Sequence, residues 1–68
     1  MSRKGFQYPY PLVSKTQAEL GKEVDIVGNA YQNAGWIEVD TIPADGFPTH
    51  IVFEWQNDGL PVYPTITL

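Results

Sequence analysis

Four side chains carry the groups that acid–base or metal chemistry would need. They are the imidazole of His50 and the carboxylates of Glu38, Asp40 and Glu54. His50 is the only histidine and there is no cysteine, which excludes a thiolate nucleophile and a thiolate metal site. Paired carboxylates can share a proton in acid–base catalysis or hold Ca²⁺ or Mg²⁺.

These side chains lie on segments in which apolar and polar residues alternate, as they do in β-strands. We predict strands over 36–42, 50–56 and 62–67, with the turn cluster "PADGFP" between the first two. An even register would set Glu38 opposite Glu54, with Asp40 on the same face. Like charges in such positions destabilise a sheet and indicate a cation or a basic partner. No calcium-loop spacing or activated nucleophile is present, so we predict no catalytic residue, no metal and no cofactor.

Trp36 precedes this alternation. If Ile37 and Val39 face the core, Trp36 faces outward with Glu38 and Asp40. It is then either an anchor for a basic, partly apolar partner, or covered by the aromatic residues of the proline-rich N-terminal segment. The predicted partner-binding residues are Trp36, Glu38, Asp40, Glu54, Tyr8 and Tyr10.

The charge is divided along the chain. Residues 1–22 contain four basic residues and one acid, a charge of +3. The remainder contains seven acids and no lysine or arginine, a charge of −7, and the sum is the net −4. Residues 23–68, with their negative charge, would repel the phosphates of nucleic acid. Their acids form a solvated surface or a face for a basic protein.

Residues 16–34 can be interpreted as helix or as strands. A helical stripe is present: Leu20, Val24, Val27, Tyr31 and Ala34. Gly21 and Gly28 would each cost such a helix about 1 kcal/mol, and its β-branched residues oppose it further. The strand interpretation places Gly21, Gly28 and Gly35 in turns. It leaves a short helix or turn at 15–20, with Ser14 or Thr16 as its N-cap. We favour the strands.

"GKEVDIVGNAYQNAGWIEVD" resembles the opening of KOW-type SH3-like barrels, with a glycine, V-x-I, a loop, a second glycine and a hydrophobic strand. The matching positions are Gly21, Val24, Ile26, Gly28, Gly35, Ile37 and Val39. The resemblance implies a small β-barrel. Its loop "NAYQNA" lacks the Lys and Arg of RNA-binding members, so the closer analogy is with small SH3-like subunits that dock on larger complexes.

The expected fold is therefore mostly β: a small SH3-like barrel or an antiparallel meander of four to five strands. An extended Pro/Tyr arm (1–13) precedes a single small domain (14–68). The alternative is α+β and winged-helix-like, with one helix at about 16–34 followed by a three-stranded antiparallel sheet. In it, "KTQAELGKEV" resembles the first helix of a helix-turn-helix and "VGNAYQNAGW" its recognition helix, without a basic residue.

The expected function is non-catalytic protein binding, as an accessory subunit or small inhibitor docking on a larger complex. A winged-helix-like transcriptional regulator and a small carboxylate-based metal-binding protein are the alternatives. We expect a protein partner with a basic surface or a homo-oligomer, and neither nucleic acid nor membrane. The chain has no apolar run of about 20 residues and no signal-peptide pattern, so the expected location is cytoplasmic.

Overall fold

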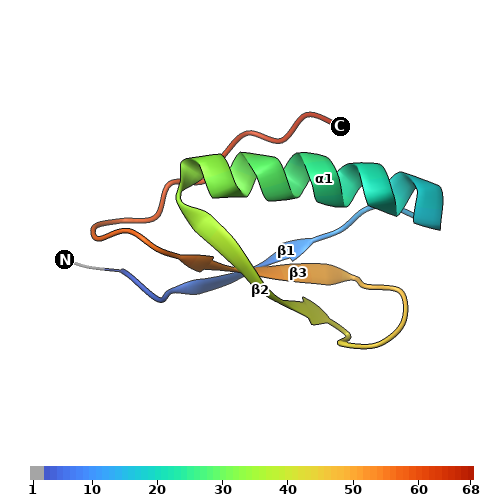
Figure 1. The fold of residues 1–68 in the computed structure, drawn as a ribbon, viewed down its shortest axis with the longest axis horizontal. Coiled ribbons are helices and arrows are strands. Elements are labelled where there is room, and N and C mark those ends of the chain that lie inside the picture. Colours follow the sequence, from blue (N-terminus) through green and yellow to red (C-terminus); the bar gives the residue numbers. More distant parts are fainter. Residues whose placement is uncertain (1–2) are drawn as a thin grey trace.

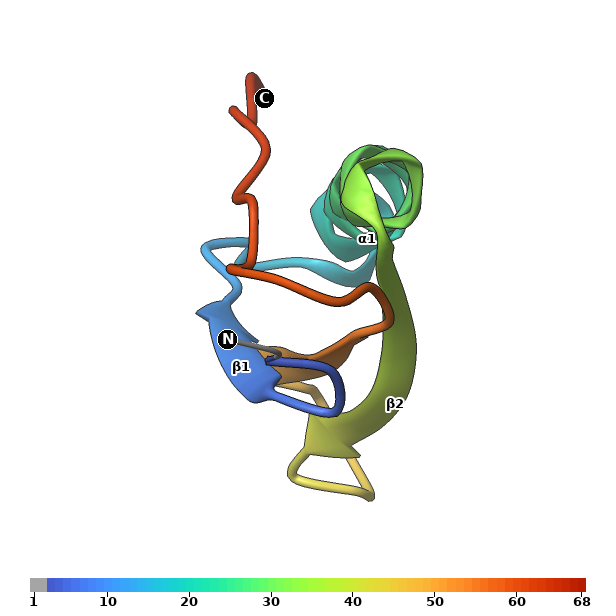
Figure 2. The same cartoon turned by 90° about the vertical axis from the view of Figure 1, so that its left-hand side faces the viewer.

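The fold is a single helix on one face of an antiparallel sheet (Figure 1). A computed structural model describes residues 3–68. The elements are β1 (Gln7–Pro11), α1 (Gln17–Ala34), β2 (Trp36–Ile42) and β3 (His50–Trp55), and the strand order in the sheet is β1-β3-β2. Figure 2 shows α1 and the C-terminal segment on the same side of the sheet. Within residues 3–68, no helix or strand covers the opposite face of the sheet.

Helix α1 runs unbroken from Gln17 to Ala34, so the strand interpretation of this stretch is wrong. Thr16 begins the helix, because its hydroxyl accepts from the Glu19 backbone N–H at 3.2 Å and donates to the Glu19 carboxylate at 3.0 Å. Val27 and Tyr31 are 0% and 3% exposed. Burying such side chains contributes about 1.5–3 kcal/mol each, which outweighs the propensity cost of the helical glycines.

The α+β alternative is the correct fold class, with one difference. Its three-stranded antiparallel sheet is present, but β1 comes before the helix. The two stretches expected as separate helices of a helix-turn-helix are halves of α1. Only three strands form among residues 3–68, so the mostly-β barrel of four to five strands is wrong.

The strand predictions are confirmed for the hairpin of β2 and β3 and wrong for the C-terminal segment. Strand β2 has the predicted bounds, and β3 ends one residue before the predicted end. Residues 62–67 form no strand. The third strand is β1, which lies within the proline-rich segment expected as an arm.

Gly35 ends α1 and was correctly expected in a turn. Its φ of 114° lies in the left-handed region, and its N–H donates to the carbonyls of Tyr31 (3.1 Å) and Gln32 (3.2 Å). A Cβ at this position would meet the Asn57 side chain and the ring of Trp55. The tight reversal allows β2 to begin at the next residue, Trp36.

The core between α1 and the sheet is aromatic, with Tyr31 at its centre. Its ring stacks on Phe53 of β3 at 4.3 Å and meets Trp36 of β2 edge-on at 5.7 Å. From β1, Tyr10 lies 5.6 Å away and Tyr8 6.5 Å. One helical side chain thus contacts all three strands. Burial, followed by the neighbouring tyrosines, raises the pKa of Tyr31 to about 12.

Two glycine-to-alanine substitutions separate these backbone effects. We expect Gly35→Ala to lower the free energy of unfolding by about 1–3 kcal/mol, because alanine resists positive φ and its methyl group meets Asn57 and Trp55. Gly28→Ala is the matched control: the site is inside α1, nothing lies near the added methyl, and we expect a gain of about 1 kcal/mol. Urea denaturation measures both. A destabilising Gly28→Ala would contradict a continuous helix.

Candidate functional site

The uncovered face of the sheet is the largest candidate surface. Side chains alternate along β3, with Ile51, Phe53 and Trp55 buried and the residues between them turned the other way. Register partners in an antiparallel sheet share a face, which identifies the residues on this side. We call it the outer face, and it consists of Gln7, Pro9, Pro11, Ile37, Asp40, Ile42, His50, Val52 and Glu54.

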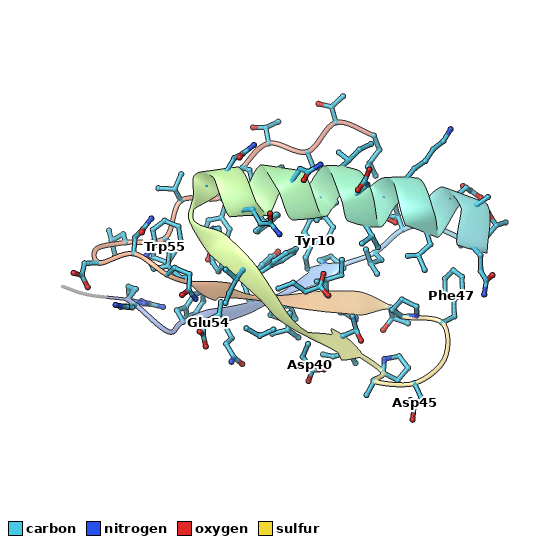
Figure 3. The ribbon with its side chains drawn as sticks, viewed as in Figure 1. Tyr10, Asp40, Asp45, Phe47, Glu54 and Trp55 are labelled. Carbon is cyan, nitrogen blue, oxygen red and sulfur yellow. The ribbon has the colours of Figure 1, made fainter. Side chains whose placement is uncertain are left out.

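The outer face combines apolar side chains with carboxylates. Ile37 and Ile42 are 44% and 45% exposed, and Val52 lies between their strand and β1. Figure 3 shows Asp40 and Glu54 on the side of the sheet away from α1, whereas Tyr10 lies between the sheet and the helix. The Glu54 carboxylate accepts from the side-chain amides of Gln56 (3.1 Å) and Gln7 (3.4 Å). No lysine or arginine stands on this face.

The predicted carboxylate cluster does not form, because the register is shifted by one residue. Glu54 pairs with Ile37, and Glu38 pairs with Phe53. A β-bulge between Glu38 and Asp40 then changes the alternation, so Asp40 falls on the outer face and Glu38 does not. Among residues 3–68 there is no group of three or more His, Cys, Asp or Glu side chains placed to hold a metal ion.

Trp36 is 1% exposed, so the prediction that it faces outward is wrong. It pairs with Trp55 on the helix side of β2, and its neighbour Ile37 pairs with Glu54 on the outer face. Part of the N-terminal segment packs on Trp36 inside the core: the rings of Phe6 and Tyr8 lie 6.2 and 6.3 Å from its ring. Tyr10 instead packs on Tyr31. At the start of β2 the aromatic Trp36, and not the aliphatic Ile37, faces the core.

Both free edges of the sheet are protected. The Leu12 N–H donates to the Thr49 carbonyl, just before β3. By alternation the N–H groups of Tyr8 and Tyr10 point toward β3, which leaves Pro9 and Pro11 where an N–H would point out of the sheet. On β2 the bulge interrupts the edge, and the Asp40 carboxylate accepts from the Thr41 N–H at 2.8 Å. Proline, bulges and charge are the usual protections against strand addition.

Glu23 is a buried carboxylate that sequence reasoning missed. It is 2% exposed and accepts from the Ser14 hydroxyl at 2.5 Å and from the backbone N–H groups of Ser14 (2.9 Å) and Val13 (3.0 Å). Burial raises its pKa, but these hydrogen bonds outweigh that effect, and the pKa is lowered overall. Glu23 is therefore ionised and anchors the β1–α1 connection. Glu23 lies on the same helical stripe as Val27 and Tyr31, and this position in the sequence could have indicated that it is buried.

His50 offers no catalytic arrangement. Its Nδ1 shares a hydrogen bond of 2.9 Å with the Thr49 hydroxyl, which itself lies 2.9 Å from the Ile42 carbonyl oxygen. The Ser14 hydroxyl donates to the buried Glu23 carboxylate and is not hydrogen-bonded to His50. A nucleophile activated by His50 is not formed by these contacts.

An open groove lies between the first half of α1 and the β2–β3 loop. Its lining includes the apolar side chains of Leu20, Val24 and Phe47, together with Gly21 and Asp25. Figure 3 shows Phe47 close to the N-terminal end of α1. Sequence reasoning did not identify this groove, because it depends on the loop folding toward the helix.

Comparisons with protein-family models, curated proteins and solved structures find no match to this chain. Its function is therefore argued from its own residues. Within residues 3–68, no helix combines the length and the apolar character that crossing a bilayer requires.

Glu23→Gln tests the anchoring role of the buried carboxylate. At neutral pH we expect a loss of about 1–3 kcal/mol in the free energy of unfolding, since an amide NH₂ group would face three donors. The lowered pKa means that the unfolded chain binds the proton more readily. The contribution of Glu23 is thus complete above its ordinary pKa of 4.5 and lost as the pH falls through its folded pKa.

The variant should therefore lose less stability than the wild type when the pH falls from 7 to 3, measured by urea denaturation. Asp25→Asn, on an exposed position of the same helix, is the matched control and should follow the wild-type profile. If Glu23→Gln lost as much unfolding free energy as the wild type between pH 7 and 3, groups other than Glu23 would be responsible for that loss.

Proposed function

We propose that this chain is a non-catalytic protein-binding module, an accessory subunit or small inhibitor of a larger assembly, that docks through its outer face. One observation carries the proposal: one face of the sheet has no covering layer and exposes apolar side chains between carboxylates. Such a mixture of an apolar centre with charged surroundings is typical of docking surfaces. Ile37, Ile42 and Val52 would form the centre of contact.

The protected edges favour docking on the face over strand addition. Pro9 and Pro11 remove donors from the β1 edge, and the bulge with the Asp40 carboxylate interrupts the β2 edge. A partner that added a strand would have to displace these features. The outer face requires no such change.

The charge distribution supports a basic partner. Asp40 and Glu54 belong to the outer face, and every lysine and arginine of the chain lies before residue 23. Carboxylates around an apolar centre attract lysine and arginine and accelerate encounter with a basic surface. They also oppose face-to-face pairing of two copies, since like charges would meet.

The roles of the predicted partner-binding residues differ in this proposal. Asp40 and Glu54 steer the partner. Trp36, Tyr8 and Tyr10 are interior or half-buried and maintain the sheet that carries the face. Glu38 is exposed but pairs with Phe53 across the sheet, on the side away from the outer face, and we assign it no contact.

Matched charge reversals test the docking face. We expect Asp40→Lys and Glu54→Lys, combined, to weaken partner binding at least about tenfold at 0.15 M salt, because two attractions become repulsions. Asp25→Lys with Glu19→Lys, on exposed positions of α1, makes the same charge change away from the face and should bind as the wild type does. Affinity capture with quantitative mass spectrometry, followed by titration of the captured protein, measures both.

The apolar centre is tested in the same assay. Ile37→Ser with Ile42→Ser should abolish capture, while Leu60→Ser with Leu68→Ser, on exposed apolar residues of the C-terminal segment, should not. If a captured protein bound the two charge-reversal variants and the two serine variants equally, the outer face would not be the docking site.

A further inference from the structure

The groove between the first half of α1 and the β2–β3 loop is a cavity that docking on the outer face does not use. Its volume is about 670 Å³. Pockets that hold small organic ligands usually have volumes of roughly 300–1,000 Å³. The groove is therefore large enough to hold a small molecule.

Most of the groove lining is apolar and still accessible to solvent. Phe47 is 41% exposed, and Leu20 and Val24 are half-buried. Pro48 adds a fourth apolar side chain from the loop. An apolar molecule that covered these side chains would remove their surface and its own from water, which favours binding.

Two glycines keep the groove wide. Gly21 lines it on the helix side and Gly46 on the loop side. Nothing lies within 4 Å of the position that a Cβ would take at either residue. The space beside both glycines is therefore open, and a large side chain at position 21 would project into it.

The polar side chains of the lining are free to meet a ligand. They are the Gln17 amide and the Asp25 carboxylate, and within residues 3–68 neither forms a hydrogen bond or an ion pair. No lysine, arginine or histidine contributes to the lining, so the charge of the groove comes from Asp25. An apolar surface beside an unpaired carboxylate is complementary to a molecule that is apolar and positively charged.

We propose that this groove binds a small organic cation, which consists of an apolar body and one amine. The apolar body lies on Leu20, Val24 and Phe47, and the amine pairs with Asp25. Figure 3 shows Phe47 close to the N-terminal end of α1, where the helix dipole carries partial positive charge and disfavours a cation. The amine is therefore directed toward Asp25, and the apolar body toward Phe47.

The site does not depend on the proposed function. Helix α1, which forms one side of the groove, lies on the side of the sheet opposite Asp40 and Glu54 of the outer face. Substitutions in the groove and on the outer face therefore separate the two proposals, and Asp25 remains a distant control for docking on the outer face.

Two matched probes test the charge selection. Phenylpropylamine and phenylpropionate have similar apolar bodies and opposite charges at neutral pH. In an NMR titration of the full chain at about 0.15 M salt, we expect the amine to move the amide resonances of Leu20, Gly21 and Phe47. Its dissociation constant should be on the order of 1 mM, with phenylpropionate at least about threefold weaker. Unmoved resonances, or equal binding of the two probes, would overturn the proposal.

Matched charge reversals distinguish Asp25 from the net charge of the chain. Asp25→Lys should reverse the preference, so that phenylpropionate binds more tightly than phenylpropylamine. Glu54→Lys makes the same change in net charge on the outer face and should keep the preference for the amine. If both variants lost the preference to the same extent, net charge alone would explain it and the assignment to Asp25 would be wrong.

A leucine at position 21 tests whether the probe lies in the groove. Gly21→Leu fills the open space, and the helix is retained because leucine favours helix more than glycine does. We expect this variant to bind phenylpropylamine at least about tenfold more weakly. Asn33→Leu, on an exposed position of α1 outside the groove, should bind as the wild type does. Unchanged affinity in Gly21→Leu would contradict the site.

A dilution series tests for a second copy of the chain in the groove. Without a probe, we expect the resonances of Leu20, Gly21 and Phe47 to be independent of protein concentration. If they moved as the concentration rose, a second copy would occupy the groove, and the proposal of a small organic cation would be wrong.

Discussion

The structure depends on one side chain, Tyr31, that joins a single helix to three strands. Its ring stacks on Phe53 at 4.3 Å and meets aromatic rings from β1 and β2. A chain of 68 residues without disulfides has few other means of fixing a helix on a sheet. Large aromatic side chains make this possible because each buries roughly 150–250 Å² and adds a specific ring geometry.

The aromatic core determines what the two sides of the sheet can do. With one helix available, only part of the helix side is covered, and the C-terminal segment completes the cover through Tyr63 and Ile66. Among residues 3–68 no helix or strand remains to cover the other side. The exposed outer face and the irregular C-terminal segment on the helix side are thus both consequences of the small number of helices and strands.

Local signals in the sequence predicted part of this fold. The turn cluster at 43–48 and the alternation on either side of it predicted the β2–β3 hairpin, and Thr16 was one of the two predicted N-caps. The helix itself was predicted only as the alternative, because glycine and β-branched propensities were weighed above the stripe of Val27 and Tyr31. Tertiary burial overrides propensity in this way when one face meets a large partner. Strand β1 was missed because prolines in it indicated an unpaired arm.

The candidate site was less predictable than the fold. One bulge near Val39 changes which of the later residues of β2 face outward, and no residue type in "WIEVDTI" indicates it. Asp40 and Glu54 were identified by charge alone and do fall on the outer face. Trp36 was assigned to the wrong side. Its partner, the Val62 carbonyl, lies 26 residues away in the chain and could not be inferred from spacing.

A double-mutant cycle between Tyr31 and Phe53 tests the central interaction most directly. Tyr31→Leu, Phe53→Leu and the double variant keep apolar volume and remove the stacked pair, with free energies of unfolding measured by urea denaturation. The packing described here predicts a coupling energy of about 0.5–1.5 kcal/mol. Additive effects of the two substitutions would mean that the helix and the sheet are not joined through these rings.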